Sequence, residues 1–188
     1  MKSVYRRDPG ATPAAILMRF RLPSLLLLAA LAWPPAHADD LSSAQRLWLA
    51  GQKTQAVAQI EQALALTPDN LQLRFALGVM RMELGDRAQA VTIFTRLTQD
   101  FPDLADPYNN LAVLHAAAGE LDEARMALEQ ALRLQPEHAQ AQENLGDVLL
   151  RLALRAYQRA QKASIAHSSA LDAKINRTLA LTRELRTP

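Results

Sequence analysis

The chain has 188 residues, a length that suits one domain, and it contains no cysteine. The lack of cysteine excludes disulfides, thiol catalysis, zinc-thiolate sites and an N-terminal cysteine that carries a lipid. The formal net charge is +2, but residues 1–38 contribute five Lys or Arg and one Asp, so the rest of the chain has a net charge of −2. The overall charge therefore does not indicate nucleic acid binding.

Residues 1–38 have the features of a secretion signal. Arg19 and Arg21 precede an apolar run from Leu25 to Trp33, and Ala36-His37-Ala38 has the small residues of a cleavage site. The apolar run has nine residues, which are too few to span a bilayer. An uncleaved anchor or a helix of the core is the alternative interpretation of this segment.

We expect a Sec-type signal peptide of bacterial type that is cleaved after Ala38. Translation starts at either Met1 or Met18, because a start at Met18 gives a compact signal of 21 residues and a start at Met1 gives a long, irregular one. Since the chain has no cysteine for lipid attachment, the mature protein is expected in the periplasm.

The first segment after the signal, Asp40–Pro68, predicts two short helices. Asp39 or Asp40 can cap the first of them, whose apolar side includes Leu41 and Trp48. Trp48 either closes the end of the hydrophobic core or contacts a partner. Terminal units of repeat proteins are often irregular, and this unit departs from those that follow.

Two regular helical pairs follow, at Leu71–Pro102 and Asp106–Pro136. In the second pair, Asp106 is a suitable N-cap and Pro107 suits the first turn of a helix. Apolar residues recur at helical spacing in both pairs, and Gly119 indicates the turn between the two helices of the second pair. Neither helix of a pair can bury its apolar side alone, so the pairs are expected to stack.

The next segment begins like the others and then changes. No Gly, Pro, Asn or Asp interrupts the sequence after its first helix, which favours one continuous helix from about Ala139 to Ala166. A tight, irregular hairpin is the alternative, because Ala153, Tyr157 and Ala160 have the small–aromatic–small pattern of the second helix of a pair.

The chain ends in a basic helical tail. Ser168 or Ser169 can cap a last helix, Ala170–Leu185. Residues 39–150 carry 8 positive and 16 negative side chains, a net charge of −8, whereas residues 151–188 carry 8 positive and 2 negative ones, a net charge of +6. The two parts are thus of opposite charge.

Three positions recur with a period of 34 residues, and they hold a proline, a glycine and an alanine: Pro68, Pro102, Pro136; Gly51, Gly85, Gly119; Ala56, Ala90, Ala124. This period and these residue types resemble the tetratricopeptide repeat (TPR). Leu77-Gly78 and Leu145-Gly146 match the Leu-Gly pair of that family, Leu111-Ala112 is a near match, and Phe94 and Leu128 fill its large apolar position. The resemblance covers roughly residues 40–150.

The resemblance implies an all-α fold, a right-handed α-solenoid of TPR helix–turn–helix units with a C-terminal capping helix. The organisation that we expect is a signal peptide at 1–38 and a solenoid of three repeats plus the first helix of a fourth at 39–150. A degenerate repeat and the basic capping helix follow at 151–188.

In the TPR family the first helix of each repeat lines a concave groove that binds partners. The positions of this chain that match groove positions include ten residues that we expect to contact a partner: Phe75, Val79 and Met82 in repeat two, Asp106, Asn109 and Asn110 in repeat three, and Glu143, Asn144, Asp147 and Arg151 in repeat four. Gln72, Ala76, Val113, Ala117 and Gln140 also match groove positions. The three residues of repeat two can form an apolar pocket, in which Met suits adaptable recognition, or they can simply pack against repeat one.

Asn110 and Asn144 are 34 residues apart, and each precedes the Leu of its repeat. An Asn amide both donates and accepts hydrogen bonds, so it can pair with the backbone of an extended peptide. The resemblance implies such a ladder, because asparagine ladders bind peptide backbones in several TPR families. The alternative is that each Asn bonds a neighbouring helix of the solenoid.

The groove positions are acidic, at Asp106, Glu143 and Asp147, and Arg151 is their one basic residue. TPR grooves that clamp a carboxylate use Lys and Arg, so a partner segment with Lys or Arg is expected here instead of an acidic tail.

The sequence contains no H-E-x-x-H, no G-x-S-x-G and no phosphate-binding Gly loop. We therefore expect a non-enzymatic scaffold of the bacterial cell envelope that binds a peptide or protein and uses no metal, cofactor or nucleic acid. Self-association of the acidic solenoid with the basic tail is the alternative. Binding of the basic helix to a membrane surface is disfavoured, because that helix lacks bulky aromatic residues.

Overall fold

The computed structural model describes residues 37–164 and 168–184, and this part of the chain is all-α, as predicted. It contains the helices α1 (His37–Leu49), α2 (Lys53–Leu66), α3 (Leu71–Glu83), α4 (Arg87–Asp100), α5 (Ala105–Ala117), α6 (Leu121–Leu134), α7 (Ala139–Ala163) and α8 (Ser169–Glu184). The predicted signal peptide lies outside the described residues, apart from His37 and Ala38, which begin α1. Asp39 and Asp40 therefore lie inside α1, and neither is the N-cap that we expected.

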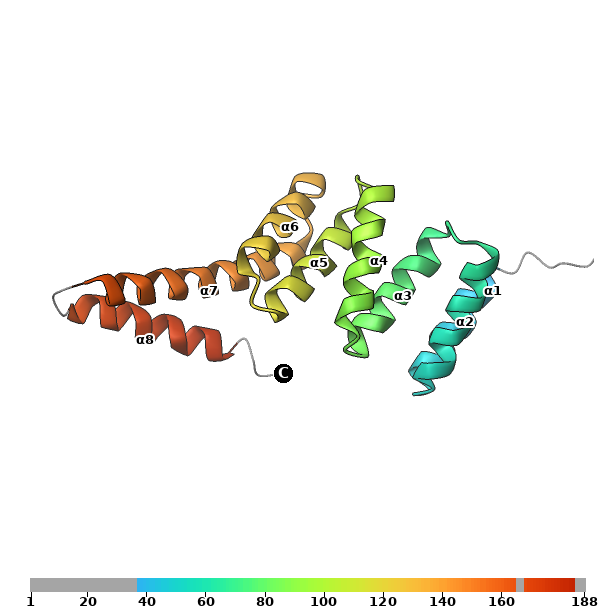
Figure 1. Cartoon of the computed structure of the whole chain (residues 1–188), viewed down its shortest axis with the longest axis horizontal. Coiled ribbons are helices and arrows are strands. Elements are labelled where there is room, and N and C mark those ends of the chain that lie inside the picture. The colour runs from blue at the N-terminus through green and yellow to red at the C-terminus, as the bar shows by residue number, and fades with distance from the viewer. Residues whose placement is uncertain (1–36, 165–167, 185–188) are drawn as a thin grey trace, which may run out of the picture. The chain divides into compact units, whose positions relative to one another are not determined.

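Helices α1–α2, α3–α4 and α5–α6 form successive pairs (Figure 1). The turn of the middle pair requires glycine, because Gly85 has a φ of 78°, in the left-handed region. There the Gly85 N–H donates to the Met82 carbonyl at 3.0 Å and the Asp86 N–H donates to the Arg81 carbonyl at 2.9 Å, which satisfies the last carbonyls of α3. Gly51 and Gly119 adopt the same conformation, so each 34-residue period becomes one helical pair.

Polar side chains cap the N-termini of α3, α4 and α7. The Asn70 side chain accepts a hydrogen bond from the Leu73 N–H at 3.1 Å, and the Asp86 side chain accepts one from the Gln89 N–H at 3.3 Å. At α7 the cap is His138, whose Nδ1 accepts from the Ala141 N–H at 3.2 Å. These bonds satisfy N–H groups that have no partner within the helix.

The cap that we predicted at Asp106 is wrong. Helix α5 begins one residue earlier, at Ala105, and its N-cap is Leu104, which makes no side-chain cap. The Asp106 carboxylate instead accepts a hydrogen bond from Nε2 of His138 at 3.0 Å, across the boundary between repeats three and four. Pro107 does lie in the first turn of α5, where an N–H is not needed.

The hydrophobic core consists of three clusters, each formed by one helical pair and the first helix of the next repeat. The first contains Ile60 and Leu73, the second contains Phe94 and Leu111, and the third contains Leu128 and Val148. Each cluster therefore joins two repeats, as the unpaired apolar sides predicted.

Phe94 is fully buried and fixes the packing of repeat two. Its ring meets Phe75 edge to face, with the centroids 5.7 Å apart and the planes at 70°. A Cβ at Gly78 would lie 2.8 Å from Cζ of Phe94, so only glycine lets α3 approach α4 this closely. The Leu-Gly pair of repeat two is thus explained by packing.

Helix α7 continues without a break from Ala139 to Ala163, so the continuous helix is confirmed and the hairpin is not formed. Helix α8 runs beside it (Figure 1), and its buried residues include Ile175 and Thr178. The Ser168 hydroxyl accepts from the Leu171 N–H at 3.3 Å, which confirms a serine cap. No helix within 37–164 and 168–184 combines the length and the apolar composition that crossing a bilayer requires.

Candidate functional site

A large cavity, which we call the α1/α3/α5 pocket, lies between the first helices of repeats one, two and three. It has a volume of about 670 Å³. Its wall is mostly apolar and comes from α1 (Leu41, Gln45, Trp48, Leu49), from α3 (Leu71, Gln72, Phe75, Ala76, Val79, Met80, Glu83) and from the start of α5 (Leu104, Asp106, Pro107). Volume and composition are those of a binding pocket for organic groups.

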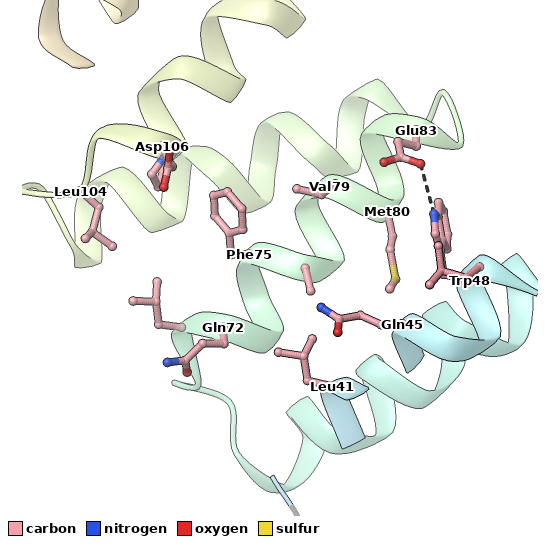
Figure 2. Close-up of a pocket in the computed structure, with 14 residues that line it drawn as sticks. Leu41, Gln45, Trp48, Gln72, Phe75, Val79, Met80, Glu83, Leu104 and Asp106 are labelled. Carbon is pink, nitrogen blue, oxygen red and sulfur yellow. Dashed lines mark hydrogen bonds between the residues drawn. The ribbon is translucent and has the colours of Figure 1, made fainter. Parts of the chain in front are cut away.

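Two carboxylates lie at the edge of this apolar wall, Glu83 near Trp48 and Asp106 near Leu104 (Figure 2). The Trp48 indole N–H donates to Oε2 of Glu83 at 3.2 Å. Asp106 accepts from His138, yet its side chain is 68% exposed. Both carboxylates can therefore accept further hydrogen bonds from a bound cation.

A second cavity, the α5/α7 pocket, lies between the first helices of repeats three and four. It has a volume of about 190 Å³, and its polar residues are Asn144, Asp147 and Arg151. Small side chains of α5, among them Ala112, Ala116 and Ala117, leave this space open. Nη1 of Arg151 donates to the Ala116 carbonyl at the long distance of 3.4 Å.

Of the two asparagines of the predicted ladder, Asn144 bonds a neighbouring helix, which is the alternative given above for each Asn. Nδ2 of Asn144 donates to Oδ1 of Asn109 at 2.8 Å, and Oδ1 of Asn144 accepts from Gln140 at 3.3 Å. Asn109 is buried, so this pair joins α5 to α7 within the solenoid. Among the described residues the Asn110 side chain has no hydrogen-bond partner, and it lines neither of the two pockets.

The ten predicted groove residues are thus divided. Phe75, Val79 and Asp106 line the α1/α3/α5 pocket, whereas Asn144, Asp147 and Arg151 line the α5/α7 pocket. Met82 packs against the core of repeat two, and Glu143 is exposed and lines neither pocket.

The pocket also contains residues that sequence reasoning missed, and the period could have found them. Leu41 and Gln45 lie one period before Phe75 and Val79, and Glu83 lies two periods before Arg151. Repeat one is irregular, so its sequence alone does not indicate that these residues continue the groove. Trp48 packs against the hydrophobic core, one of its two predicted roles, and it also lines the pocket, where it could contact a partner.

Away from the pockets, Glu120 joins repeats two and three. Its Oε2 lies 2.6 Å from Nδ1 of His115 and 2.7 Å from Nη2 of Arg87. The hydrogen bond to His115, and then that to Arg87, lower the pKa of Glu120. No group of three or more metal-ligating side chains occurs within 37–164 and 168–184.

Similarity to known sequences covers the same region as the helical pairs. A sequence profile described as Tetratricopeptide repeat matches residues 47–114, and a second with the same description matches residues 109–164. No curated protein matches the chain in sequence.

Several solved structures share the fold at low sequence identity. MamA from Desulfovibrio magneticus, solved from its residue 41 to its end, is 17% identical, with a TM-score of 0.56 over 80% of this chain and 77% of that one. The first TPR of Spaghetti (RPAP3), bound to the HSP90 peptide SRMEEVD, is 18% identical, with a TM-score of 0.58 over 62% and 92%. PcrH from Pseudomonas aeruginosa is 22% identical, with a TM-score of 0.55 over 60% and 90%.

The two profile matches together span more than half of the chain, and the helical pairs and the left-handed glycines recur in the structure with the same period. The chain therefore belongs to the tetratricopeptide repeat family, and its fold is a TPR α-solenoid.

Proposed function

We propose that this protein is a non-enzymatic scaffold of the bacterial cell envelope that binds a peptide or protein segment in the α1/α3/α5 pocket. The observation that carries the proposal is the pocket itself. Its volume is about 670 Å³ and its wall is apolar although it opens to solvent. Open apolar surface of this kind is unusual in a monomeric protein unless something binds there. Among the proteins of similar fold, the RPAP3 domain is bound to a peptide.

The proposed partner segment carries an apolar side chain and a Lys or Arg close to it. The apolar side chain would lie against Phe75 and Val79, and the cation would pair with Glu83 or Asp106. The net charge of −8 over residues 39–150 favours the same sign of partner, because it would attract a basic segment before contact.

Capture of partners from an envelope extract tests the proposal. The double variant Glu83→Gln and Asp106→Asn keeps the shape of the pocket and removes its two carboxylates. The matched control is Asp69→Asn with Glu123→Gln, which neutralises two exposed carboxylates that do not line the pocket. A partner that the parent and the control retain and the pocket variant loses supports the site. Equal retention by all three proteins would place the binding surface elsewhere.

The cellular location belongs to the same proposal and has its own test. We expect the mature chain to begin at Asp39 and to be found in the periplasmic fraction. Mass spectrometry of the purified protein gives its N-terminus directly. A cytoplasmic protein that retains residues 1–38 would contradict the envelope role and leave the pocket proposal unchanged.

Self-association is a second candidate, and the charges of the last two helices favour it. Arg159, Lys162 and Arg177 form no ion pair within the described residues, whereas residues 39–150 carry the net charge of −8. Attraction between the tail of one copy and the solenoid of another would weaken with salt. Sedimentation at low and high salt tests this: a monomer at every protein concentration and salt concentration would eliminate it.

A further inference from the structure

Helix α7 is one continuous helix, yet it carries the sequence patterns of both helices of a repeat. It has 25 residues, whereas α3 and α4, the two helices of repeat two, have 13 and 14. Its first half contains Gly146, which lies two periods after Gly78 of α3. Its second half repeats the spacing of three buried residues of α4: Ala153, Tyr157 and Ala160 match Ala90, Phe94 and Leu97. Repeat four therefore has both patterns but no turn between them.

The side of α7 that bears Gly146 is open. A Cβ at Gly146 would meet nothing within 4 Å, whereas the ring of Phe94 occupies the corresponding place beside Gly78. Leu149, one turn after Gly146, is 46% exposed, and Ala160 at the far end of the same side is exposed as well. An exposed apolar side chain among small residues on one side of a helix allows a second helix to pack closely there.

Helix α8 does not fill this place, because it packs against the second half of α7. Nζ of Lys174 lies 5.7 Å from the centre of the Tyr157 ring. Residues of the last turn of α8 line a cavity together with Arg151 and Leu154. Helix α8 therefore ends beside the middle of α7 and leaves Gly146 uncovered.

We propose that the protein forms an antiparallel dimer in which each copy supplies the second helix that repeat four of the other copy lacks. The second half of one α7 packs on the first half of the other, so Tyr157 of each copy lies over Gly146 of the other. The contact is the one that Phe94 makes beside Gly78 within repeat two. A twofold axis makes the two contacts equivalent, and loss of the hinge between two elements favours their exchange between copies.

The charges of α7 favour a second copy as the occupant and select the antiparallel direction. Residues 139–150 contain the carboxylates Glu143 and Asp147 and no Lys or Arg, whereas residues 151–163 contain four Lys or Arg and no carboxylate. Antiparallel pairing sets the acidic half of each α7 against the basic half of the other. The packing also continues the pairing of a first helix with a second one that joins α3 to α4 and α5 to α6.

This dimer differs from an attraction between the basic tail of one copy and the acidic solenoid of another. Its contact is mainly apolar, so high salt should not dissociate it. It uses no residue of the α1/α3/α5 pocket, so dimerisation and capture of a partner in that pocket succeed or fail independently.

Sedimentation equilibrium of the purified protein measures the dimer directly. Gly146→Ala adds a methyl group that meets no atom of its own chain but lies under Tyr157 of the other copy. It should leave the monomer folded, since alanine favours a helix, and weaken dimerisation by about tenfold or more. Tyr157→Ala should weaken dimerisation as well. The matched control is Gln158→Ala, at an exposed residue outside this side of α7, which should dimerise like the parent.

Crosslinking tests the antiparallel register. When Tyr157 lies over Gly146, Ala153 of one copy lies opposite Leu150 of the other, because the numbers of paired residues in two antiparallel helices have a constant sum. The chain has no cysteine, so Ala153→Cys and Leu150→Cys can be placed in two copies that carry different tags. We expect a disulfide between the two tagged copies, and none when Gln158→Cys replaces Leu150→Cys.

Four results would overturn the proposal. They are a monomer at every protein concentration, a dimer that high salt dissociates, a dimer that Gly146→Ala and Tyr157→Ala weaken no more than the control does, and a dimer without the disulfide between positions 153 and 150. Circular dichroism of each variant confirms that its helices are intact, so a loss of dimer is not mistaken for a loss of fold.

Discussion

Repeats two and four carry the same dipeptide, Leu-Gly, in the same register, and the structure gives the two glycines different surroundings. A Cβ at Gly78 would lie 2.8 Å from Cζ of Phe94, whereas a Cβ at Gly146 would meet nothing within 4 Å. The difference arises because α3 is followed by a turn and α4 packs against it, while α7 continues past the position of the turn.

In a repeat sequence, the residues that identify the first helix are therefore different from those that decide whether a second helix packs on it. The Leu-Gly pair identifies the first helix of a TPR, because Leu77 and Leu145 both pack against a core cluster. Whether a second helix covers that glycine depends on residues after it, namely Gly85 with Asp86 in repeat two and their absence in repeat four. Leu149, one turn after Gly146, is accordingly 46% exposed.

The largest difference in stability between variants of repeats two and four is expected at their aromatic residues, Phe94 and Tyr157. Phe94 is fully buried, so Phe94→Ala should lower the free energy of unfolding by about 3–5 kcal/mol. Tyr157 has the corresponding place in the predicted pattern but is only half-buried in α7, so Tyr157→Ala should cost about 1 kcal/mol. Urea unfolding followed by circular dichroism measures both. Equal losses would mean that Tyr157 is packed as tightly as Phe94.

The two glycines should respond to alanine with opposite signs. Gly78→Ala pushes a methyl group into a buried ring and should destabilise the fold by about 1–3 kcal/mol. Gly146→Ala meets no atom and should stabilise α7 by up to about 1 kcal/mol, because glycine is a poor helix former. Thermal unfolding of the two variants shows whether each substitution raises or lowers the stability. Destabilisation by both would show that a second helix covers Gly146 in solution.

A smaller difference in stability is expected between variants of Asn110 in repeat three and Asn144 in repeat four. Asn144→Ala removes the donor to Asn109, which is buried, and should cost about 1–3 kcal/mol. Asn110→Ala breaks no hydrogen bond with a described residue and should change the stability by about 0.5 kcal/mol or less. Urea unfolding distinguishes the two variants. A costly Asn110→Ala would assign Asn110 to the core.

Asn110→Ala is therefore the variant that tests the peptide ladder, since it leaves the Asn109–Asn144 pair intact. Loss of partner capture at unchanged stability would support a backbone contact from Asn110. Unchanged capture would remove the ladder from the binding site.

The smallest expected effect is on the pH dependence of stability, through Glu120 at the junction of repeats two and three. Folding lowers the pKa of Glu120, so its contribution to stability is present above the unfolded pKa and is lost as pH falls through the folded pKa. Glu120→Gln should remove that part of the acid sensitivity, whereas Glu143→Gln, at an exposed carboxylate of repeat four, should not. Thermal unfolding between neutral and acidic pH compares them. Parallel pH profiles of parent and Glu120→Gln would contradict this assignment.

Much of the fold could be predicted from the period, because glycines, prolines and small residues at fixed spacing identify both the turns and the close contacts. The continuous α7 could also be predicted from the sequence, since no Gly, Pro, Asn or Asp occurs from Arg151 to Ala163, where a turn would otherwise be expected. The cap at Asp106 could not be predicted, because a carboxylate in the first turn of a helix can bond either a backbone N–H or a side chain such as His138.

The candidate site was predicted less completely, for a physical reason. Register assigns a residue to a face of its helix, but the volume between two helices depends on the side chains of both. Thus the small residues Ala112 and Ala116 open a pocket beside Asn144, and the amide of Asn144 turns to Asn109 instead of standing free beside Asn110. The 34-residue period does not predict where α8 packs, because α8 follows the repeats and packs against α7.

Photo-crosslinking in envelope extract tests the binding role of the α1/α3/α5 pocket most directly. A photoreactive phenylalanine replaces Gln72, which is exposed and lines the pocket, or Gln62, which is exposed on α2 and does not line it. We predict a crosslinked partner from the Gln72 position and none from the Gln62 position. The same crosslinks from both positions, or none from Gln72, would contradict binding in the pocket.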